Sequence, residues 1–364
     1  MKGNMMDRIA PIDFMAYRDS FAVNREVSSV LVSGNQELCP DPVLSIVIPT
    51  YKRPNYLKYA LESALNQKDT DVSYEVVVVD NEPTSEAGSQ TEAVIAQYHA
   101  KNLFYYRNTG NLGIAGNWNR CAQLARGRWV AYLHDDDLLI PDYICRMTKL
   151  LHRKNNAGGI IALAIERHGE GDIQEVMSIP RSRASMMYDA ISRGKLMRLR
   201  RTDSHITIAN AYGVPTCGSA FRRDLLLASG GFNERFYPSF DWFLLYRFSG
   251  RHRLYRSMER LGYYRVLVNV SLSDKTKEAF LRDRLSFVRY MAEHTRTGRV
   301  LRKLFENEQN KKILHEEYTD YKGKQAEDYF EPSALKDRPV RKILYHVLTK
   351  MYWKVKSYWC LIFG

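Results

Sequence analysis

Residues 129–137 read WVAYLHDDD and are the most informative segment of this chain. The short apolar run predicts a buried strand, and three adjacent carboxylates, Asp135, Asp136 and Asp137, follow at its C-terminal end. Three such charges repel one another and are costly to bury unless a cation lies among them. Since ligands of open α/β sheets bind just outside the carboxyl ends of strands, these acids indicate a divalent cation that holds a diphosphate. The alternative is a polar turn in which Asp137 caps a helix.

The chain on either side of this segment alternates strands and helices in the manner of a parallel sheet. Four apolar runs predict strands, at residues 44–49, 74–80, 103–106 and 129–134. Helical patterns separate them, at residues 54–67, 86–99 and 113–126. Beyond Asp137 the pattern loosens, and we expect helices at 141–153 and 241–248 and strands at 159–166 and 219–222. Together these elements predict an α/β fold with helices on both faces of a buried, mostly parallel sheet.

The composition favours anionic partners. Lys and Arg number 54 against 41 Asp and Glu, so the formal net charge is +13. Such an excess suits nucleic acid, anionic lipid or phosphorylated substrates. The sequence shows neither a zinc-finger spacing nor an aromatic RNA-binding strand, and we expect no nucleic-acid partner. The five cysteines are scattered without a C-x-x-C pair, which predicts a reducing cytoplasm and argues against zinc or disulfides.

Two further patterns bear on the location of the protein. No apolar run approaches the roughly 18 residues that a membrane span needs. The N-terminal residues lack the basic and apolar regions of a secretory signal. Both observations favour a cytoplasmic protein.

Polar or special residues stand at the ends of all four predicted strands. These ends are residues 49–53, 80–81, 107–113 and 134–137. A single aspartate at a strand end is often only a helix cap, but four such ends fall at the same edge of a parallel sheet. They therefore predict that a nucleotide lies across this edge.

With these segments the sequence resembles the family 2 glycosyltransferases of the GT-A fold. The motifs that carry the resemblance are SIVIPTY at 45–51, Arg53-Pro54, EVVVVDN at 75–81, NLG at 111–113, LHDDD at 133–137, GGFNE at 230–234 and FDW at 240–242. The resemblance implies a GT-A, Rossmann-like, mostly parallel sheet flanked by helices. It also implies an inverting transferase that uses a nucleotide-diphospho sugar, most often UDP-linked, together with Mn²⁺ or Mg²⁺.

The resemblance and the composition together divide the chain into three regions. Residues 1–42 form an N-terminal extension. Residues 43–270 form the GT-A catalytic domain, with a nucleotide-binding half at 43–140 and an acceptor half at 141–270. Residues 271–364 form a helical, basic and amphipathic C-terminal region.

The resemblance also implies roles for individual residues. Eight positions would bind the nucleotide sugar: Pro49, Thr50, Tyr51, Arg53, Asp80, Asn111, Gly113 and Asp135. Among them, Asp80 would accept a hydrogen bond from the uracil N–H. Asp136 would be the principal metal ligand, with Asp137 beside it. Asp241 would be the general base that deprotonates the acceptor hydroxyl, and the alternative is an N-cap of the helix that follows.

Three positions depart from the family pattern. His134 stands where many members carry Asp, and we treat it as structural and leave it outside the metal shell. Phe240 stands where a Glu often precedes the base, and Leu267 where a strand often ends in a metal-binding His. A cation held only by the aspartates and the diphosphate would therefore be more exchangeable. The Gln-x-x-Arg-Trp signature of processive synthases does not occur, so we expect one sugar per acceptor.

The last residues carry an amphipathic pattern of their own. Residues 338–364 include no acid, while apolar residues recur at helical spacing among the rings of Tyr352, Trp353 and Tyr358. This combination predicts a helix that lies in an anionic membrane interface. The alternative is an amphipathic helix that packs on the protein core or in a homodimer interface. A lipid-linked acceptor at the inner leaflet would account for this helix and for the net charge. We therefore expect a cytoplasmic protein that is peripheral on the inner membrane.

The expected function is transfer of a sugar to a glycan or lipid-linked acceptor in surface polysaccharide synthesis. A sugar nucleotidyltransferase is less favoured, because it needs a glycine-rich basic loop after the first strand and residues 49–53 have no glycine. A catalytically silent nucleotide- or glycan-binding scaffold is the alternative from another class. Residues 216–221 either line the acceptor side or form an ordinary buried strand.

Overall fold

The computed structural model describes residues 13–14, 16–85, 89–167, 175, 199–202, 216–265, 274–296, 299–300, 303–304, 340, 343–345 and 347. The chain divides into two compact units, which we call the sheet unit and the helical unit. The sheet unit comprises residues 17–235, 240–267 and 363–364. The helical unit comprises residues 1–16, 236–239 and 268–362.

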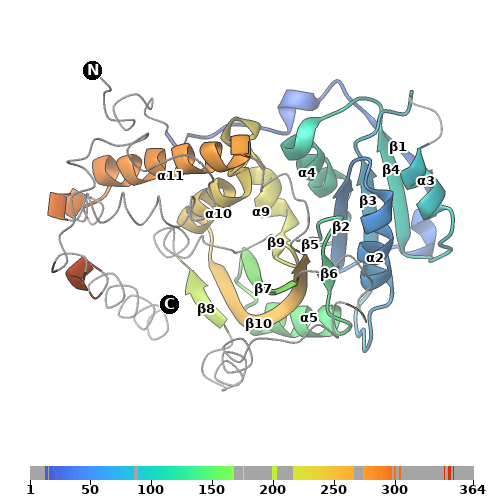
Figure 1. Ribbon diagram of the computed structural model, residues 1–364. Helices are drawn as coiled ribbons and strands as arrows, with labels where there is room; N and C mark the ends of the chain where they lie inside the picture. Colours follow the sequence, from blue (N-terminus) through green and yellow to red (C-terminus); the bar gives the residue numbers. More distant parts are fainter. Residues whose placement is uncertain are drawn as a thin grey trace. The chain divides into compact units, whose positions relative to one another are not determined.

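One sheet forms the centre of the sheet unit (Figure 1). In chain order its strands are β1 (Ser29–Ser33), β2 (Leu44–Thr50), β3 (Tyr74–Asp80), β4 (Leu103–Asn108), β5 (Trp129–Tyr132), β6 (Leu138–Leu139), β7 (Gly159–Arg167), β8 (Leu199–Thr202), β9 (Ala220–Arg222) and β10 (Leu254–Arg265). Across the sheet the order is β1-β4-β3-β2-β5-β9-β7-β10-β6, and β8 pairs with β10. Strands β2 to β5 pair in parallel, whereas β9 joins β5 to β7 by antiparallel pairings.

Helices cover both faces of this sheet. They are α2 (Pro54–Leu65), α3 (Gln90–Ile95), α4 (Gly113–Leu124), α5 (Tyr143–Arg153), α9 (Arg223–Ala228) and α10 (Phe240–Arg251). Ile46 and Ile48 of β2 share one buried cluster with Leu57 of α2. Val47 alternates with them and points to the opposite face, where α4 lies against β2 and β3. Both faces of the strands are buried, and the predicted α/β fold is confirmed.

The predicted elements differ from the observed ones mainly at their ends, whereas β6, β8 and α9 were not predicted. The helix predicted at 86–99 is only α3, whose N-cap Ser89 accepts from the Glu92 N–H, and residues 86–88 lie outside the described part. Strand β1 was not predicted, because its residues are mostly exposed and show no alternation. It lies antiparallel to β4 at the edge of the sheet.

The helical unit contains α11 (Asp274–His294) and an aromatic cluster. The ring of Phe14 lies 5.6 Å from that of Phe236, 5.4 Å from that of Phe287 and 5.3 Å from that of Tyr290. All four side chains are buried. Ring contacts of this kind add to the apolar burial that holds α11 in its unit.

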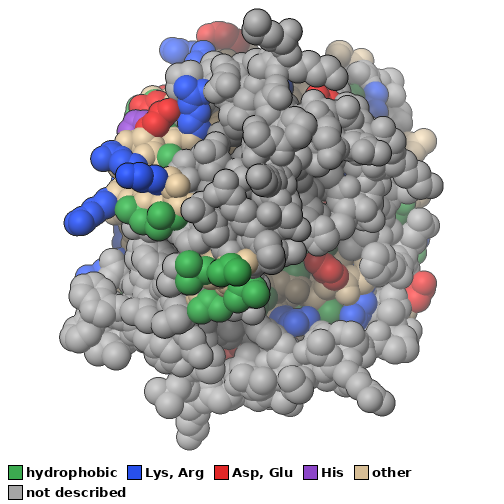
Figure 2. All heavy atoms as spheres, turned by 60° about the vertical axis from the view of Figure 1, so that its left-hand side comes forward, with side chains coloured by type: hydrophobic (Ala, Val, Ile, Leu, Met, Phe, Trp, Pro, Cys, Tyr) green, Lys and Arg blue, Asp and Glu red, His purple; other side chains and the backbone are tan. Residues whose placement is uncertain are grey.

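Most of the predicted C-terminal helix, residues 338–364, lies outside the described residues. Its described residues 340, 343–345 and 347 are helical. Figure 2 brings the left-hand side of Figure 1 forward and shows hydrophobic side chains of described residues gathered in a patch on this face. Within the described part of the chain, no helix combines the length and the apolar character that a membrane crossing requires.

Candidate active site

The segment between β5 and β6, residues 133–137, carries the candidate site, and we call it the acid turn. Asp135 is anchored to the loop after β2: Thr50 Oγ1 donates to its Oδ2 at 2.9 Å, and Arg53 Nη1 donates to its Oδ1 at 3.2 Å. The same guanidinium contacts Asp136, with 2.9 Å between Arg53 Nη2 and Asp136 Oδ2. One arginine thus neutralises two of the three acids, as their mutual repulsion requires.

The third acid pairs with a histidine of the same turn. His134 Nδ1 lies 2.9 Å from Asp137 Oδ2, and Asp137 Oδ1 accepts from the backbone N–H of Arg265 at 2.9 Å. Burial lowers the pKa of His134, but the hydrogen bond and charge of Asp137 outweigh it and raise this pKa to about 9. Burial raises the pKa of Asp135 to about 7, against the lowering effect of Arg53. The turn therefore holds several charges in a nearly dry place.

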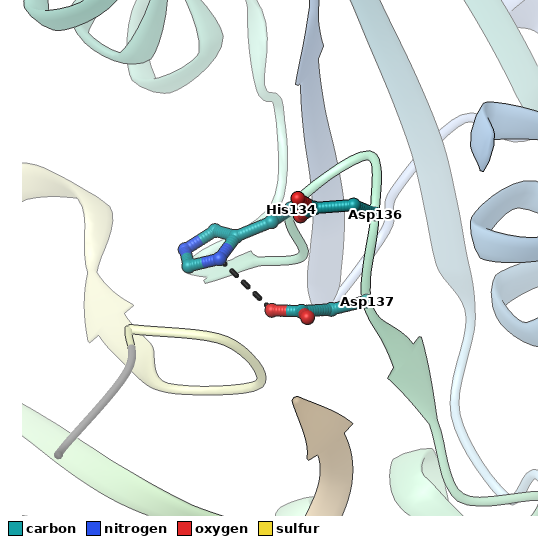
Figure 3. Close-up of side chains that lie close together, drawn as sticks. All are labelled: His134, Asp136 and Asp137. Atoms are coloured by element: carbon teal, nitrogen blue, oxygen red, sulfur yellow. Dashed lines mark ion pairs between the residues drawn. The ribbon is translucent and has the colours of Figure 1, made fainter. Parts of the chain in front are cut away.

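His134, Asp136 and Asp137 form a group that fits a divalent cation. One ligand atom from each of the three residues lies within 4.8 Å of the others. Figure 3 shows the imidazole pointing toward the carboxylate of Asp137, with Asp136 above them on the same turn. Carboxylate oxygens are ligands that Mn²⁺ and Mg²⁺ take, and imidazole is a common metal ligand. Sequence reasoning left His134 out of this group, because a single histidine after a strand carries no such signal.

Asp241 lies close enough to His134 for the charge of each residue to shift the pKa of the other. It stands in the first turn of α10, which begins one residue earlier at Phe240, so it is not the N-cap of this helix. Its Oδ1 accepts from the Trp242 N–H at 2.7 Å. Burial raises the pKa of Asp241, while the Trp242 N–H and the charge of His134 lower it. His134 therefore connects the acid turn to the predicted base.

The His134 ring is held firmly in this position. Its Nε2 lies 3.0 Å from Thr216 Oγ1, and its centroid is 5.1 Å from that of Trp118. The Trp118 ring also contacts Phe232 and Phe240 edge to face, at 5.2 Å each. Phe240 directly precedes Asp241, so this aromatic cluster leads to the predicted base. Of residues 216–221, Thr216 thus contacts the site, while β9 is a buried strand.

The loop before Asp241 depends on the N-terminal part of the sheet unit. Gly230 has φ +84°, and a Cβ there would lie 2.1 Å from the Arg18 carbonyl oxygen, so only glycine fits. The Ser20 N–H donates to the Gly230 carbonyl at 2.9 Å. Asn119 of α4 bonds both the N–H and the C=O of Phe232, at 2.7 and 2.8 Å. No pattern in residues 17–33 predicted that they brace this loop.

The residues predicted for the nucleotide base form a second cluster at the same sheet edge. Asp80 is fully buried, and its carboxylate accepts from Tyr105 Oη at 2.9 Å, Ser89 Oγ at 3.3 Å and the Glu82 N–H at 2.9 Å. Burial raises the pKa of Asp80, and these hydrogen bonds oppose it.

Asparagines link this cluster to the end of β2. Asn111 Oδ1 accepts from the Gly113 N–H at 2.8 Å and from Asn81 Nδ2 at 3.0 Å. Asn117 Nδ2 reaches the Thr50 carbonyl at 3.4 Å and the Val79 carbonyl at 3.0 Å. Sequence reasoning missed Asn117, whose side chain bonds residues at the ends of β2, β3 and β4.

The structure thus arranges the predicted residues in two groups. Pro49 and Thr50 end β2, and Thr50 and Arg53 contact the acid turn directly. Tyr51, between them, is 43% exposed and points away from the core. Gly113 is exposed and opens α4 with φ +69°, and no atom lies within 4 Å of an added Cβ, although its N–H and C=O bond Asn111 and Asn81.

Comparison with known proteins points to one family. Residues 45–228 match the family model described as glycosyl transferase family 2. An uncharacterized glycosyltransferase of Rickettsia bellii is 33% identical over 120 residues, which are 33% of this chain and 16% of that protein. The chain covers less than two thirds of the length of the first curated relatives it matches, at 16%, 39% and 60%.

Two solved structures resemble the chain more distantly. The S. aureus TarS complex with UDP-GlcNAc has a TM-score of 0.49 and 15% identity, over 86% of this chain and 92% of that one. The mannosyltransferase PcManGT from Pyrobaculum calidifontis, in complex with GDP-Man and Mn²⁺, has a TM-score of 0.47 and 16% identity, over 89% of this chain and 86% of that one.

Proposed function

Since this chain belongs to glycosyl transferase family 2 and is a transferase enzyme, we propose that it moves one sugar from a nucleotide-diphospho sugar to an acceptor hydroxyl, with inversion at the anomeric carbon. The acceptor is a glycan or a lipid-linked glycan of surface polysaccharide synthesis. The observation that carries the proposal is the acid turn, in which Asp136, Asp137 and His134 lie together and Arg53 stands beside them.

Asp136, Asp137 and His134 would hold a Mn²⁺ or Mg²⁺ ion. When bound, such an ion stabilises the negative charge that develops on the leaving diphosphate. Arg53 adds a second positive charge at the same place and fixes Asp135, whose carboxylate would bond the ribose. The burial of these groups strengthens each of their charge interactions.

Asp241 is proposed as the base on the acceptor side. Its carboxylate takes the proton of the acceptor hydroxyl while the hydroxyl oxygen bonds the anomeric carbon and the bond from that carbon to the diphosphate oxygen breaks. Burial raises the pKa of Asp241, which makes its carboxylate a better acceptor for this proton. A single base on the face opposite the leaving group is sufficient for inversion.

The donor is proposed to be UDP-linked. Asp80 ends β3 beside Thr50 of β2, and three internal hydrogen bonds fix its carboxylate. We propose that it also accepts from the imide N–H of uracil when the nucleotide binds. Asn111 and Gly113 close the same side of the site. The exposed ring of Tyr51 is available to the base or ribose.

An assay of donor hydrolysis without acceptor tests this proposal. UDP-, GDP- and dTDP-sugars are incubated with the protein and Mn²⁺, Mg²⁺ or EDTA. We expect slow turnover of one UDP-sugar, which EDTA and Asp136→Ala both abolish. Asp224→Ala is the matched control, because Asp224 is exposed and pairs only with Arg222 in the contacts described. Absence of both turnover and metal-dependent nucleotide binding would instead support the silent scaffold.

We further propose that the acceptor is presented at an anionic membrane surface. Four apolar residues of the C-terminal region are exposed at helical spacing: Val340, Ile343, Leu344 and Val347, at 78%, 66%, 47% and 44%. No acid occurs in residues 338–364, whereas Arg341, Lys342 and four other basic residues do. An exposed apolar stripe with only positive charges around it suits the headgroup region of an anionic bilayer.

A further inference from the structure

Arg265, the last residue of β10, has a side chain with no solvent exposure. The central carbon of its guanidinium lies 5.6 Å from the ring centroids of both Tyr56 and Tyr59 on α2. A guanidinium stays charged inside proteins, and a buried charge is costly unless hydrogen bonds and ring faces compensate for it. Because burying the charge of Arg265 costs free energy, we expect its contacts to serve a specific role.

The contacts of Arg265 converge on the acid turn. β10 pairs with β6 directly after this turn, so that Tyr263 stands opposite Leu138. Arg265 Nε donates to the carbonyl oxygen of Asp136. The backbone N–H of Arg265 donates to Asp137 Oδ1. One residue thus fixes the main chain of one acid and the side chain of the next.

The same guanidinium joins the acid turn to α2. Arg265 Nη2 donates to the Tyr56 carbonyl oxygen at 3.4 Å. The ring of Tyr56 also lies 5.2 Å from the guanidinium carbon of Arg53, the residue that contacts Asp135 and Asp136. Arg53 and Arg265 therefore both hold the acid turn, and both contact Tyr56.

We propose that Arg265 is a positioning residue for cation binding, which keeps the carboxylates of Asp136 and Asp137 close to His134. The inference rests on the proposed function, because it takes these residues as the cation ligands. The Nε bond goes to the main chain of Asp136, so it orients this residue without occupying a carboxylate oxygen. Residues that orient metal ligands typically contribute 10- to 100-fold to metal affinity.

Titration with Mn²⁺, followed by the electron paramagnetic resonance signal of free Mn²⁺ in the presence of UDP, tests this role. Arg265→Met removes the guanidinium but keeps much of the side-chain volume. We expect the Kd for Mn²⁺ to rise about 10- to 100-fold in the folded protein. Arg265→Lys keeps the charge but loses the flat, directed donors, and we expect an intermediate rise.

Arg247→Met is the matched control. Arg247 is also a buried arginine of the sheet unit and donates to the Ser229 carbonyl at 2.6 Å, away from the acid turn. The Arg247→Met substitution should lower the midpoint of thermal unfolding but leave the Kd for Mn²⁺ unchanged. Should Arg265→Met fail to fold, Arg265→Lys decides the question. Wild-type Mn²⁺ affinity in the folded Arg265 variants would overturn the inference alone, whereas a wild-type protein that binds no Mn²⁺ would overturn the proposed function as well.

Discussion

Three adjacent aspartates show how strongly position decides the chemistry of a residue. Asp135 is bonded by Thr50 and Arg53, which hold it against the end of β2. Asp136 meets the same arginine through its carboxylate, and Asp137 is fully buried and paired with His134. Because Arg53 contacts two of the acids and His134 the third, each carboxylate has a partner that offsets the repulsion among them. This differentiation supports a different role for each acid.

Asp241 gives a prediction at the scale of one residue. Asp241→Asn keeps an oxygen that can accept from the Trp242 N–H, but an amide cannot take a proton from the acceptor. We expect kcat for transfer to fall about 10²- to 10⁴-fold. Steady-state kinetics with the donor and acceptor, together with Mn²⁺ titration, measure this effect.

The KM for the donor and the Kd for Mn²⁺ should stay close to wild type in the same variant. Asp224→Asn serves as the control, because it makes the same chemical change at an exposed position. Transfer at the wild-type rate by Asp241→Asn would show that another group removes the proton.

His134 and Arg265 show which parts of the site sequence reasoning could reach. The three aspartates were predicted because they follow a buried strand directly. The partner of Asp137 within the same turn, His134, was judged structural, since spacing alone does not show where an imidazole points. Arg265 is 128 residues from Asp137 and reaches it only through the pairing of β10 with β6, a contact that no local pattern encodes.

At the scale of elements, the parallel strands were easier to predict than the antiparallel ones. β2 and β3 are buried on both faces, so they appear as continuous apolar runs with sharp ends. β1 is exposed along most of its length, and its place beside β4 follows from a distant partner. β9 was predicted from residues 219–222, whereas β6 and β8, which pair antiparallel with β10, have only two and four residues and were not predicted. The nucleotide half of the sheet was therefore predicted more completely than the rest.

Helix α11 supplies a prediction on the pH dependence of stability. Burial raises the pKa of Asp283 from an ordinary value of 3.8 to about 7, and the neighbouring Ser239 and the charge of Arg282 oppose this rise. The folded state binds the proton of Asp283 more tightly than the unfolded state does. Proton binding therefore stabilises the folded protein fully below the ordinary pKa, and this stabilisation is lost as the pH rises from about 4 to about 7. A tenfold difference in proton affinity between the folded and unfolded states corresponds to about 1.4 kcal/mol in the free energy of unfolding.

Asp283→Asn should therefore raise the midpoint of thermal unfolding at pH 8 and change it little at pH 4. Circular dichroism at both pH values measures the difference. Glu293→Gln is the control on the same helix, because Glu293 is exposed and its pair with Arg289 contributes little. A gain from Asp283→Asn that is equal at both pH values would contradict the role assigned to the buried charge.

At the scale of the whole molecule, the net charge of +13 is spread unevenly along the sequence. The proposed cation site is made of acids, whereas residues 338–364 have none. Positive charge near an anionic surface contributes about 1 kcal/mol for each residue, and apolar side chains add to it by burial. Both contributions come from the same short region, which favours a membrane surface over bulk water as its partner.

Sedimentation with lipid vesicles tests this partner. At low salt we expect the protein to bind vesicles of phosphatidylcholine mixed with phosphatidylglycerol, and not vesicles of pure phosphatidylcholine. The double change Ile343→Asp and Leu344→Asp places two negative charges on the exposed stripe and should weaken binding at least about tenfold. High salt should weaken it as well, since the attraction between surface charges is screened.

Leu38→Asp is the matched control for this experiment, because Leu38 is 55% exposed on the sheet unit. It should bind vesicles as the wild type does, and donor hydrolysis should be unchanged in both variants. A wild-type protein that stays in the supernatant and forms a dimer, which the double change dissociates, would show that the stripe pairs with a second copy. Loss of vesicle binding without loss of hydrolysis would instead separate the two tasks: the acid turn performs the chemistry, and the C-terminal region brings it to a lipid-linked acceptor.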